Sequence, residues 1–206
     1  MPYNPTTHHR RSIRLKGYDY SQAGMYFVTI CCQDKICRFG KIENEAMVLN
    51  DFGKIAYDEW VKLQERYPNV LLDIFQIMPN HIHGIIVLND VGATLAVALN
   101  DDAVAQNKGA GASPAPTNVL NDVANDNGAG ASPAPTVGNI VGGYKSLVVN
   151  RCLEICKSQN DYMGKLWQRN YWEHIIRNEH SYQHIADYIF NNPINWDNDT
   201  LYSANI

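Results

Sequence analysis

The sequence lacks any long apolar run. No stretch approaches the roughly 20 apolar residues that a membrane-spanning helix needs. Residues 1–16 are polar and basic, whereas a secretory signal peptide has an apolar centre. These absences argue against a membrane partner and lead us to expect a cytoplasmic protein.

Cysteine pairs suited to zinc are also missing. The chain has five cysteines, among them the neighbours Cys31 and Cys32 and the pair Cys152 and Cys156. Neither pair has the two-residue spacing that is typical of zinc knuckles, and the first pair ends a predicted strand. We therefore predict free thiols in a core that is kept in a reducing compartment.

An excess of positive charge is absent as well, because the formal net charge is −4. The distribution of charge matters more than the sum, since residues 88–140 alone account for −4 and leave the rest of the chain neutral. The amino-terminal arm is basic and has no acidic residue before Asp19. Its cations are Arg10, Arg11, Arg14 and Lys16. Such an arm either reaches along a nucleic-acid backbone or is a tail without a role.

The middle of the chain has almost no aromatic residues. Residues 89–137 are rich in Gly, Ala, Asn, Asp and Pro, and the sequence of residues 109–117 recurs 19 residues later. This repeat has no apolar face that could pack as in a solenoid. We therefore predict a disordered, repeat-bearing insertion in a single domain of residues 1–206, whose core comprises about residues 10–88 and 138–197.

Hydrophobic periodicity predicts an α+β fold. Runs of β-branched and aromatic residues indicate strands, and apolar residues three and four apart indicate helices. The predicted strands cover residues 26–32, 39–42, 70–78 and 81–88, and the predicted helices cover residues 50–66, 140–156 and 178–191. Pro193 ends the last helix, because proline cannot continue one.

The sequence MPNHIHG, which begins at Met78, is the most informative motif. His81 and His83 are two residues apart at the start of a predicted strand, so their side chains point to the same face of a sheet. Two imidazoles on one face supply half of a site for a divalent metal. A lone pair of this kind is more often packing or chance, and the remaining ligands must come from elsewhere.

The last predicted helix offers further groups of this kind. Tyr188 and Asn192 are four residues apart and share one face of the helix, although asparagine before proline is also an ordinary helix stop. Imidazoles with an amide oxygen suit Mg²⁺ or Mn²⁺ better than a closed zinc site. Tyr188 is a candidate nucleophile, with Tyr182 and Tyr171 as rivals. A phenol has a pKa of about 10 and needs a proton acceptor, for which His184 is a candidate.

These residues resemble the single-tyrosine HUH transposases, and within them the REP-associated tyrosine transposases. The resemblance rests on the MPNHIHG motif, on the sequence WQRNY that begins at Trp167 and on the sequence YIFNNP that begins at Tyr188. It covers about residues 10–88 and 138–197. It implies a ferredoxin-like antiparallel sheet with helices packed on one face, interrupted by the long low-complexity insertion.

The resemblance also implies an activity. Family members cleave single-stranded DNA beside imperfect palindromic hairpins and form a 5′-phosphotyrosine and a free 3′-OH. By resemblance, His81 and His83 are metal ligands, Tyr188 is the nucleophile and Asn192 is a further ligand of Mg²⁺ or Mn²⁺. The bulky Ile82 between the histidines fits the family pattern. The implied partner is hairpin-forming DNA with REP-like palindromes, handled at the nucleoid by a monomer or a homodimer.

Cations and aromatic rings are the expected DNA contacts, because they neutralise phosphates and stack on unpaired bases. Besides the arm, the candidates are Lys145, Arg151, Trp167, Arg169, Tyr171 and Arg177. The aromatic patch also contains Trp172. We expect some of its rings in the core and one or two on bases.

Two other functions compete with a metal-dependent DNA nickase and strand transferase. One is a catalytically silent hairpin-DNA binder derived from such a transposase, although the sequence retains every expected active-site residue. The other is a histidine-triad nucleotide hydrolase, which also uses alternating histidines. That pattern needs a third histidine where this chain has Ile85, so we set it aside.

Overall fold

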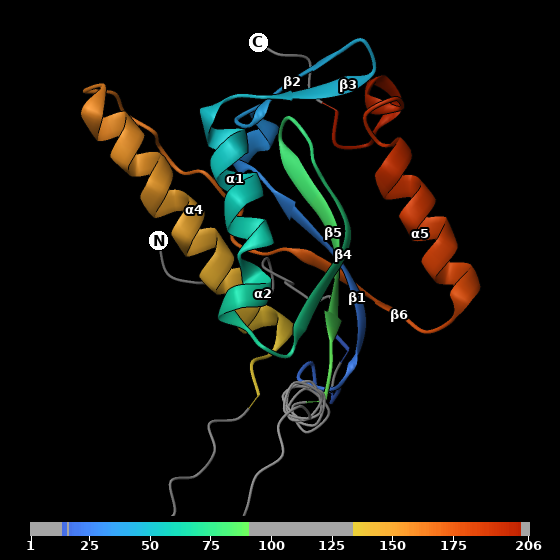
Figure 1. Ribbon diagram of the computed structural model, residues 1–206. Helices are drawn as coiled ribbons and strands as arrows, with labels where there is room; N and C mark the ends of the chain where they lie inside the picture. Colours follow the sequence, from blue (N-terminus) through green and yellow to red (C-terminus); the bar gives the residue numbers. More distant parts are fainter. Residues whose placement is uncertain (1–13, 16, 91–133, 203–206) are drawn as a thin grey trace, which may run out of the picture.

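The computed structural model describes residues 14–15, 17–90 and 134–202 (Figure 1). Arg10, Arg11, Lys16 and most of the predicted insertion lie outside these ranges. Within the described residues, no helix is long and apolar enough to cross a membrane.

Four antiparallel strands form the central sheet. They are β1 (Gly24–Cys31), β4 (Val70–Ile77), β5 (His81–Leu88) and β6 (Trp172–Ile176), in the order β4-β5-β1-β6. Helix α1 (Asp51–Val61) connects β1 to β4, and helix α4 (Val137–Ser158) connects β5 to β6 (Figure 1). This βαββαβ order is ferredoxin-like, and the predicted α+β fold class is confirmed.

Alternation along the strands creates two apolar faces. On β1, Tyr26, Val28 and Ile30 belong to the large core under α1 and α4, while Met25 and Phe27 contact a smaller cluster on the opposite face. Side chains alternate because successive residues of a strand point to opposite faces.

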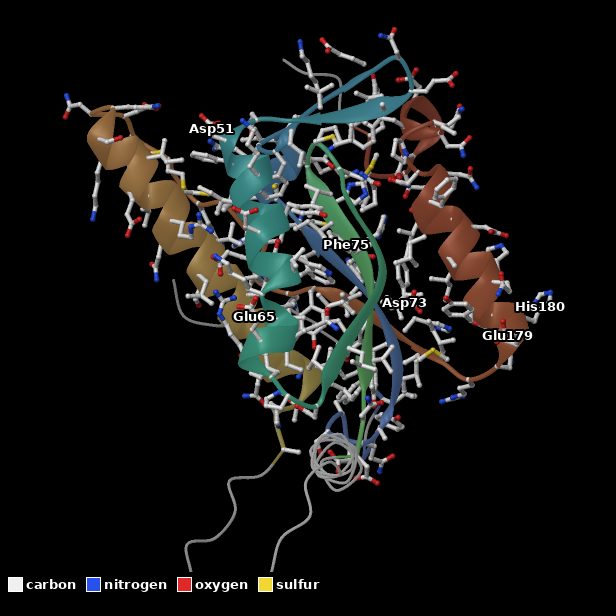
Figure 2. The ribbon with its side chains drawn as sticks, viewed as in Figure 1. Asp51, Glu65, Asp73, Phe75, Glu179 and His180 are labelled. Atoms are coloured by element: carbon white, nitrogen blue, oxygen red, sulfur yellow. The ribbon has the colours of Figure 1, made fainter. Side chains whose placement is uncertain are left out.

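Helix α5 (Glu179–Asn191) covers that opposite face, so the expectation that all helices pack on one face is wrong. Ile189 is fully buried against Ile85 and Ile176, and Tyr182 and Ile185 pack beside it. Side chains fill the space between α5 and the sheet, with Asp73 of β4 at the end where α5 begins (Figure 2). The apolar stripe of α5 must pack against an apolar surface, and the face of β5 that carries Ile85 provides that surface.

Three helices begin at side chains that cap them. Asn50 accepts a hydrogen bond from the Gly53 amide at the start of α1, and Asn178 does the same for Ser181 at the start of α5. Thr136 caps α4 by accepting from the amide of Asn139. Such caps fix where a helix starts, because the first amides have no partner within the helix.

The structure departs from the predicted elements at one helix and two strands. The helix expected over residues 50–66 is interrupted at Lys62, which separates α1 from the short α2 (Leu63–Arg66). The strand expected near residues 39–42 is β2 (Gly40–Glu43), and its hairpin partner β3 (Ala46–Leu49) has no separate signal in the sequence. Strand β6 is also absent from the sequence prediction, because short edge strands carry little hydrophobic alternation.

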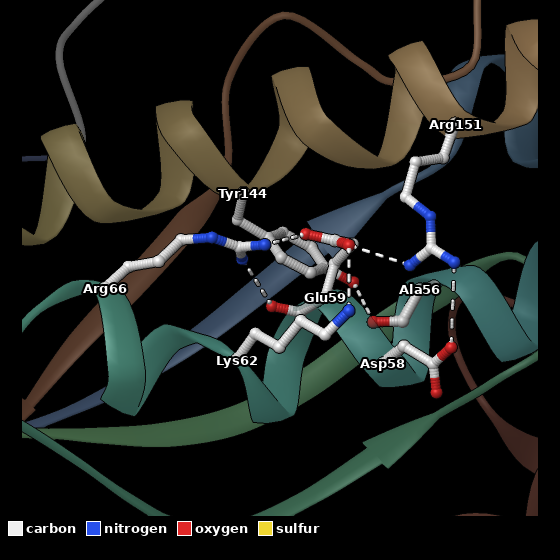
Figure 3. A network of polar contacts seen from close by, with 7 residues as sticks. All are labelled: Ala56, Asp58, Glu59, Lys62, Arg66, Tyr144 and Arg151. Carbon is white, nitrogen blue, oxygen red and sulfur yellow. Dashed lines mark hydrogen bonds and ion pairs between the residues drawn. The ribbon is translucent and has the colours of Figure 1, made fainter.

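A buried carboxylate joins the two helices of the large core (Figure 3). Glu59 of α1 is 2% exposed and accepts from Arg66 at 2.6 Å and from Arg151 of α4 at 2.7 Å. Burial alone raises the pKa of Glu59, but the two guanidinium groups outweigh it and hold this pKa below its usual range. Tyr144 adds a 2.9 Å hydrogen bond from α4 to the Ala56 carbonyl.

Candidate metal centre and tyrosine site

Strand β5 places His81 and His83 on the sheet face that α5 covers. In the strand register, His81 lies opposite Cys31 and His83 lies opposite Thr29 of β1. Both imidazoles are almost fully buried, at 0% and 2% exposure, and their ring centroids are 4.4 Å apart. Two neutral or metal-binding rings can be this close, whereas two imidazolium ions would repel each other.

The hydrogen bonds of His81 determine which ring nitrogen carries its proton. Nδ1 of His81 lies 2.8 Å from Oδ1 of Asn80. The Asn80 amide nitrogen donates to two backbone carbonyls, so its oxygen is the atom that faces the ring. An amide oxygen only accepts, so Nδ1 is protonated and Nε2 keeps a lone pair. Nε2 is buried and has no hydrogen-bond partner.

His83 is held in a similar way. Its Nδ1 lies 2.8 Å from the hydroxyl of Thr29, and its ring stacks on Phe27 at 5.3 Å between centroids. Its Nε2 lies 3.0 Å from the hydroxyl of Tyr188. Each histidine therefore uses Nδ1 for an orienting contact and directs Nε2 into a common space. Ligand histidines in metal sites are oriented in this manner.

Helix α5 brings Tyr188 and Asn192 to the histidines. The two residues are one turn apart, and the burial of Ile189 between them fixes the rotation of the helix on the sheet. Tyr188 is 40% exposed, with its ring edge-on to His83. Asn192 is 2% exposed, and its side-chain oxygen is buried without a hydrogen-bond partner. The site thus contains two unpartnered buried acceptors, Nε2 of His81 and Oδ1 of Asn192.

A carboxylate that follows α5 completes the cluster. Ligand atoms of His81, His83 and Asp199 all lie within 4.8 Å of one another. Asp199 also accepts a 2.7 Å hydrogen bond from the side-chain nitrogen of Asn192. Imidazole nitrogens with carboxylate and amide oxygens are a suitable donor set for a divalent cation, and buried acceptors without donors are otherwise costly. The arrangement can hold a metal ion.

The protonation states fit this interpretation. Burial lowers the pKa of His81 to about 3 and lowers the pKa of His83 well below its usual value. Both rings are therefore neutral near pH 7, as metal binding requires. Burial, and then the negative charge of Asp199, raise the pKa of Tyr188 to about 12. The phenol is thus protonated at neutral pH when no cation is beside it.

Comparisons with known proteins show which proteins this chain is similar to. No model of a known protein family matches the chain. An uncharacterised protein of Haemophilus influenzae is 40% identical over 200 residues, which are 97% of each chain. A second protein of that organism, provisionally named a REP-associated tyrosine transposase, is 23% identical over 85% of this chain and 73% of its own. The chain is therefore similar in sequence to a protein with the name of the REP-associated tyrosine transposases.

A solved structure shares the fold of this chain. It is a REP-associated tyrosine transposase bound to a REP hairpin, with a TM-score of 0.50 and 17% sequence identity. The similarity covers 88% of this chain and 73% of that one. At this level of identity the comparison establishes the fold, and the positions of individual residues must be argued from this chain.

Several residues predicted to contact DNA make contacts within the fold. Trp167 is 5% exposed, packs against Phe39 and donates to the carbonyl of Lys145, so its ring cannot stack on a base. Lys145 donates to the carbonyls of residues 168 and 169. Arg151 is bound to Glu59. Burial thus excludes Trp167 as a stacking platform, whereas DNA contact by Lys145 and by the 38% exposed Arg151 side chain stays a prediction.

Other predicted contacts remain at the surface. Arg169 and Arg177 are exposed just before and just after β6. Arg14 donates to the hydroxyl of Tyr171 at 2.8 Å and pairs with Glu173 at 3.2 Å, so both Arg14 and Tyr171 anchor the start of the described chain to β6.

The rivals for catalytic roles lie away from the histidines. His184 is exposed, and the phenol of Tyr188 contacts His83 instead. Tyr182 packs in the apolar cluster under α5. Tyr171 lies beside Arg14.

Sequence reasoning missed three residues of the site. Asn80 and Thr29 orient the histidines, and Asp199 contacts Asn192. Trp172 of the predicted aromatic patch is 60% exposed on the same sheet face as His83. Asn80 could have been found, because it directly precedes His81 in the motif. Asp199 lies beyond the predicted core and carries no local signal.

Proposed function

We propose that this chain cleaves and rejoins single-stranded DNA beside palindromic hairpins, with Mg²⁺ or Mn²⁺ and through a 5′-phosphotyrosine at Tyr188. The observation that carries the proposal is the 3.0 Å contact between the Tyr188 hydroxyl and His83, at the edge of the His81, His83 and Asp199 cluster. The names of a relative and of a structural neighbour, which is bound to a REP hairpin, support this choice of substrate.

The proposed reaction is a transfer between oxygens. The Tyr188 oxygen loses its proton and bonds to phosphorus, the bond from phosphorus to the 3′ oxygen breaks, and that oxygen takes up a proton and leaves as a 3′-OH. Tyr188 is 40% exposed, so water can reach the phenol and carry its proton away. A bound cation would supply charge stabilisation of the phosphate oxygens. Because one phosphodiester replaces another, a second strand can reverse the reaction without ATP.

The proposed metal ligands and the proposed nucleophile are different residues. His81, His83 and Asn192 would hold the cation, and Nε2 of His83 is then no longer available to the phenol. The Tyr188 hydroxyl, which now contacts His83, would serve as the nucleophile. We propose that a single chain suffices, because β5 and α5 of the same chain bring these residues together. The proposed place of action is the nucleoid.

An exposed surface beside the site suits unpaired DNA. Trp172 and His83 both lie opposite Thr29 in the strand register, so Trp172 stands on the same face two strands away, roughly 10 Å from His83. Its ring can stack on a base, and Arg169 and Arg177 at the ends of β6 can contact phosphates.

Covalent capture tests the proposal. Labelled hairpin oligonucleotides with unpaired flanks, taken from palindromes near the gene, are incubated with purified protein and Mn²⁺ and then separated under denaturing conditions. We expect a protein–DNA band that requires the metal and disappears in Tyr188→Phe. Tyr182→Phe, the same change on the same helix, should keep the band. DNA binding without any covalent band in the wild type would favour a silent hairpin binder.

A further inference from the structure

The segment that follows α5 contacts both sides of the metal site. After the short helix η2 (Trp196–Asn198), the carbonyl of Leu201 accepts a 2.8 Å hydrogen bond from the side-chain nitrogen of Asn80. The carbonyl of Lys35 accepts the second hydrogen of that nitrogen at 3.0 Å. These two contacts leave the Asn80 oxygen for Nδ1 of His81, which orients the imidazole on the sheet side.

Asp199 acts on the helix side of the same site. One of its oxygens accepts from the Leu201 amide at 2.6 Å, and the other accepts from the side-chain nitrogen of Asn192 at 2.7 Å. A carboxylate only accepts, so the Asn192 nitrogen must face it and the Asn192 oxygen must face away. That oxygen is buried and no group donates a hydrogen bond to it. The same holds for Nε2 of His81.

We propose that residues Asp199 to Leu201 form a positioning element that presets two metal ligands, Asn192 through Asp199 and His81 through Asn80. This inference rests on the proposed metal site. In this proposal Asp199 acts through Asn192, since one of its oxygens accepts from the Asn192 nitrogen and the other from the Leu201 amide. Direct ligation by a remaining lone pair is the alternative that the experiment below separates. Orienting partners of this kind typically change metal affinity by about 10- to 100-fold.

Mn²⁺ binding to the full-length protein tests the inference without DNA and without activity. Free Mn²⁺ is measured by electron paramagnetic resonance during a titration. We expect Asp199→Ala to weaken binding about 10- to 100-fold. Asp199→Asn keeps one oxygen that can accept from Asn192 and loses only the acceptor of the Leu201 amide, so it should retain affinity to within about fivefold. Asp197→Ala, an exposed aspartate two residues earlier, serves as the matched control and should bind as the wild type.

A double-mutant cycle separates positioning from direct ligation. If Asp199 acts through Asn192, then Asp199→Ala adds little to the loss already caused by Asn192→Ala. Losses that multiply, or a loss in Asp199→Asn as large as in Asp199→Ala, would show that the carboxylate itself binds the metal and would overturn the inference. Unchanged binding in Asp199→Ala would also overturn it. Circular dichroism of each variant shows whether a loss of Mn²⁺ affinity comes from unfolding. If Asp199→Ala does not fold, the Mn²⁺ affinity of Asp199→Asn decides between positioning and direct ligation.

The two proposals fail in distinguishable ways. If the wild type binds no Mn²⁺, the metal site of the proposed function and the positioning element both fail. If the wild type binds Mn²⁺ and Asp199→Ala does so equally well, only the positioning element fails. Asn80→Ala tests the sheet side of the positioning element separately, because it should weaken Mn²⁺ binding through His81. In the double variant, its loss of affinity should multiply with the loss caused by Asn192→Ala.

Discussion

The hydroxyl of Tyr188 lies 3.0 Å from Nε2 of His83, although the two residues are 105 positions apart in the sequence. The contact joins the exposed side of α5 to the buried strand β5. It also occupies the nitrogen that the proposed metal ion needs. The phenol of Tyr188 and a cation therefore compete for the lone pair on Nε2 of His83. Because of this competition, an experiment can separate the role of the tyrosine from that of the metal ligands.

Tyr188→Phe should strengthen Mn²⁺ binding while it abolishes covalent capture of DNA. Removing the hydroxyl deletes a hydrogen bond of about 1 kcal/mol that must break when the metal binds, so we expect affinity to rise up to about fivefold. Calorimetric titration with Mn²⁺ measures this. A loss of tenfold or more would mean that the tyrosine oxygen is itself a ligand, whereas His83→Ala should lose binding altogether.

Gly84, which ends the histidine motif, should not tolerate a side chain. A Cβ at this position would lie 2.4 Å from the ring of Trp60, which is fully buried. We expect Gly84→Ala to lower the free energy of unfolding by about 1–3 kcal/mol, measured by urea denaturation. Gly142→Ala on α4 is the control, since nothing lies within 4 Å of its Cβ. It should stabilise the protein by about 0.5–1 kcal/mol, and equal effects at the two sites would contradict this account.

Glu59 should make stability depend on pH. We expect Glu59→Gln to destabilise the protein by about 2 kcal/mol at pH 7, less than for a fully buried pair because both arginines reach solvent. The folded state holds the pKa of Glu59 below its usual range, so its contribution is complete above about pH 5 and is lost as the pH falls below about 4.3.

Urea denaturation of both proteins between pH 7 and pH 3 checks this prediction. The difference in unfolding free energy between wild type and Glu59→Gln should shrink as the pH falls. Exposed Glu65→Gln on α2 should stay within about 0.5 kcal/mol of the wild type throughout. A difference that grows toward acid pH would mean that the carboxylate is not held ionised by its arginines.

Trp172→Ala should weaken the binding of single-stranded DNA. Its ring is 60% exposed on the face that carries His83, and stacking of one base contributes about 1–3 kcal/mol. Fluorescence anisotropy with a labelled hairpin that has unpaired flanks measures the change, and the fully paired duplex should show little difference. Tyr162→Ala, an 89% exposed ring on the loop after α4, is the control. Equal losses for both variants would remove Trp172 from the DNA surface.

Much of the fold was accessible from the sequence because its strongest signals are local. A run of β-branched residues after a Pro-Asn turn predicts β5 with its bounds at residues 81–88, and helical spacing places Tyr188 and Asn192 on one face of α5. Both elements are long and strongly patterned. Strands β3 and β6 have only four and five residues, and their pairing is decided by neighbours that lie far away in the sequence.

The features that could not be predicted depend on contacts between segments that lie far apart in the sequence. Trp167 lies in a basic and aromatic sequence that is typical of a DNA surface, yet a bridge to Cys32 draws it into the core. Asp199 reaches Asn192 only because the chain turns back after α5. The role of the Asn80 oxygen follows from which carbonyls its nitrogen meets, and no sequence pattern encodes that.

The central claim is that DNA is transferred to Tyr188, and mapping the attachment site tests it most directly. The wild type is reacted with a hairpin oligonucleotide and Mn²⁺, the DNA is trimmed by nuclease, and the tryptic peptides are fragmented in a mass spectrometer. The peptide that follows Arg177 contains no further lysine or arginine and carries Tyr182, Tyr188 and Tyr202. The account predicts a nucleotide phosphate on Tyr188. A nucleotide on either of the other tyrosines, or on no tyrosine at all, would contradict it.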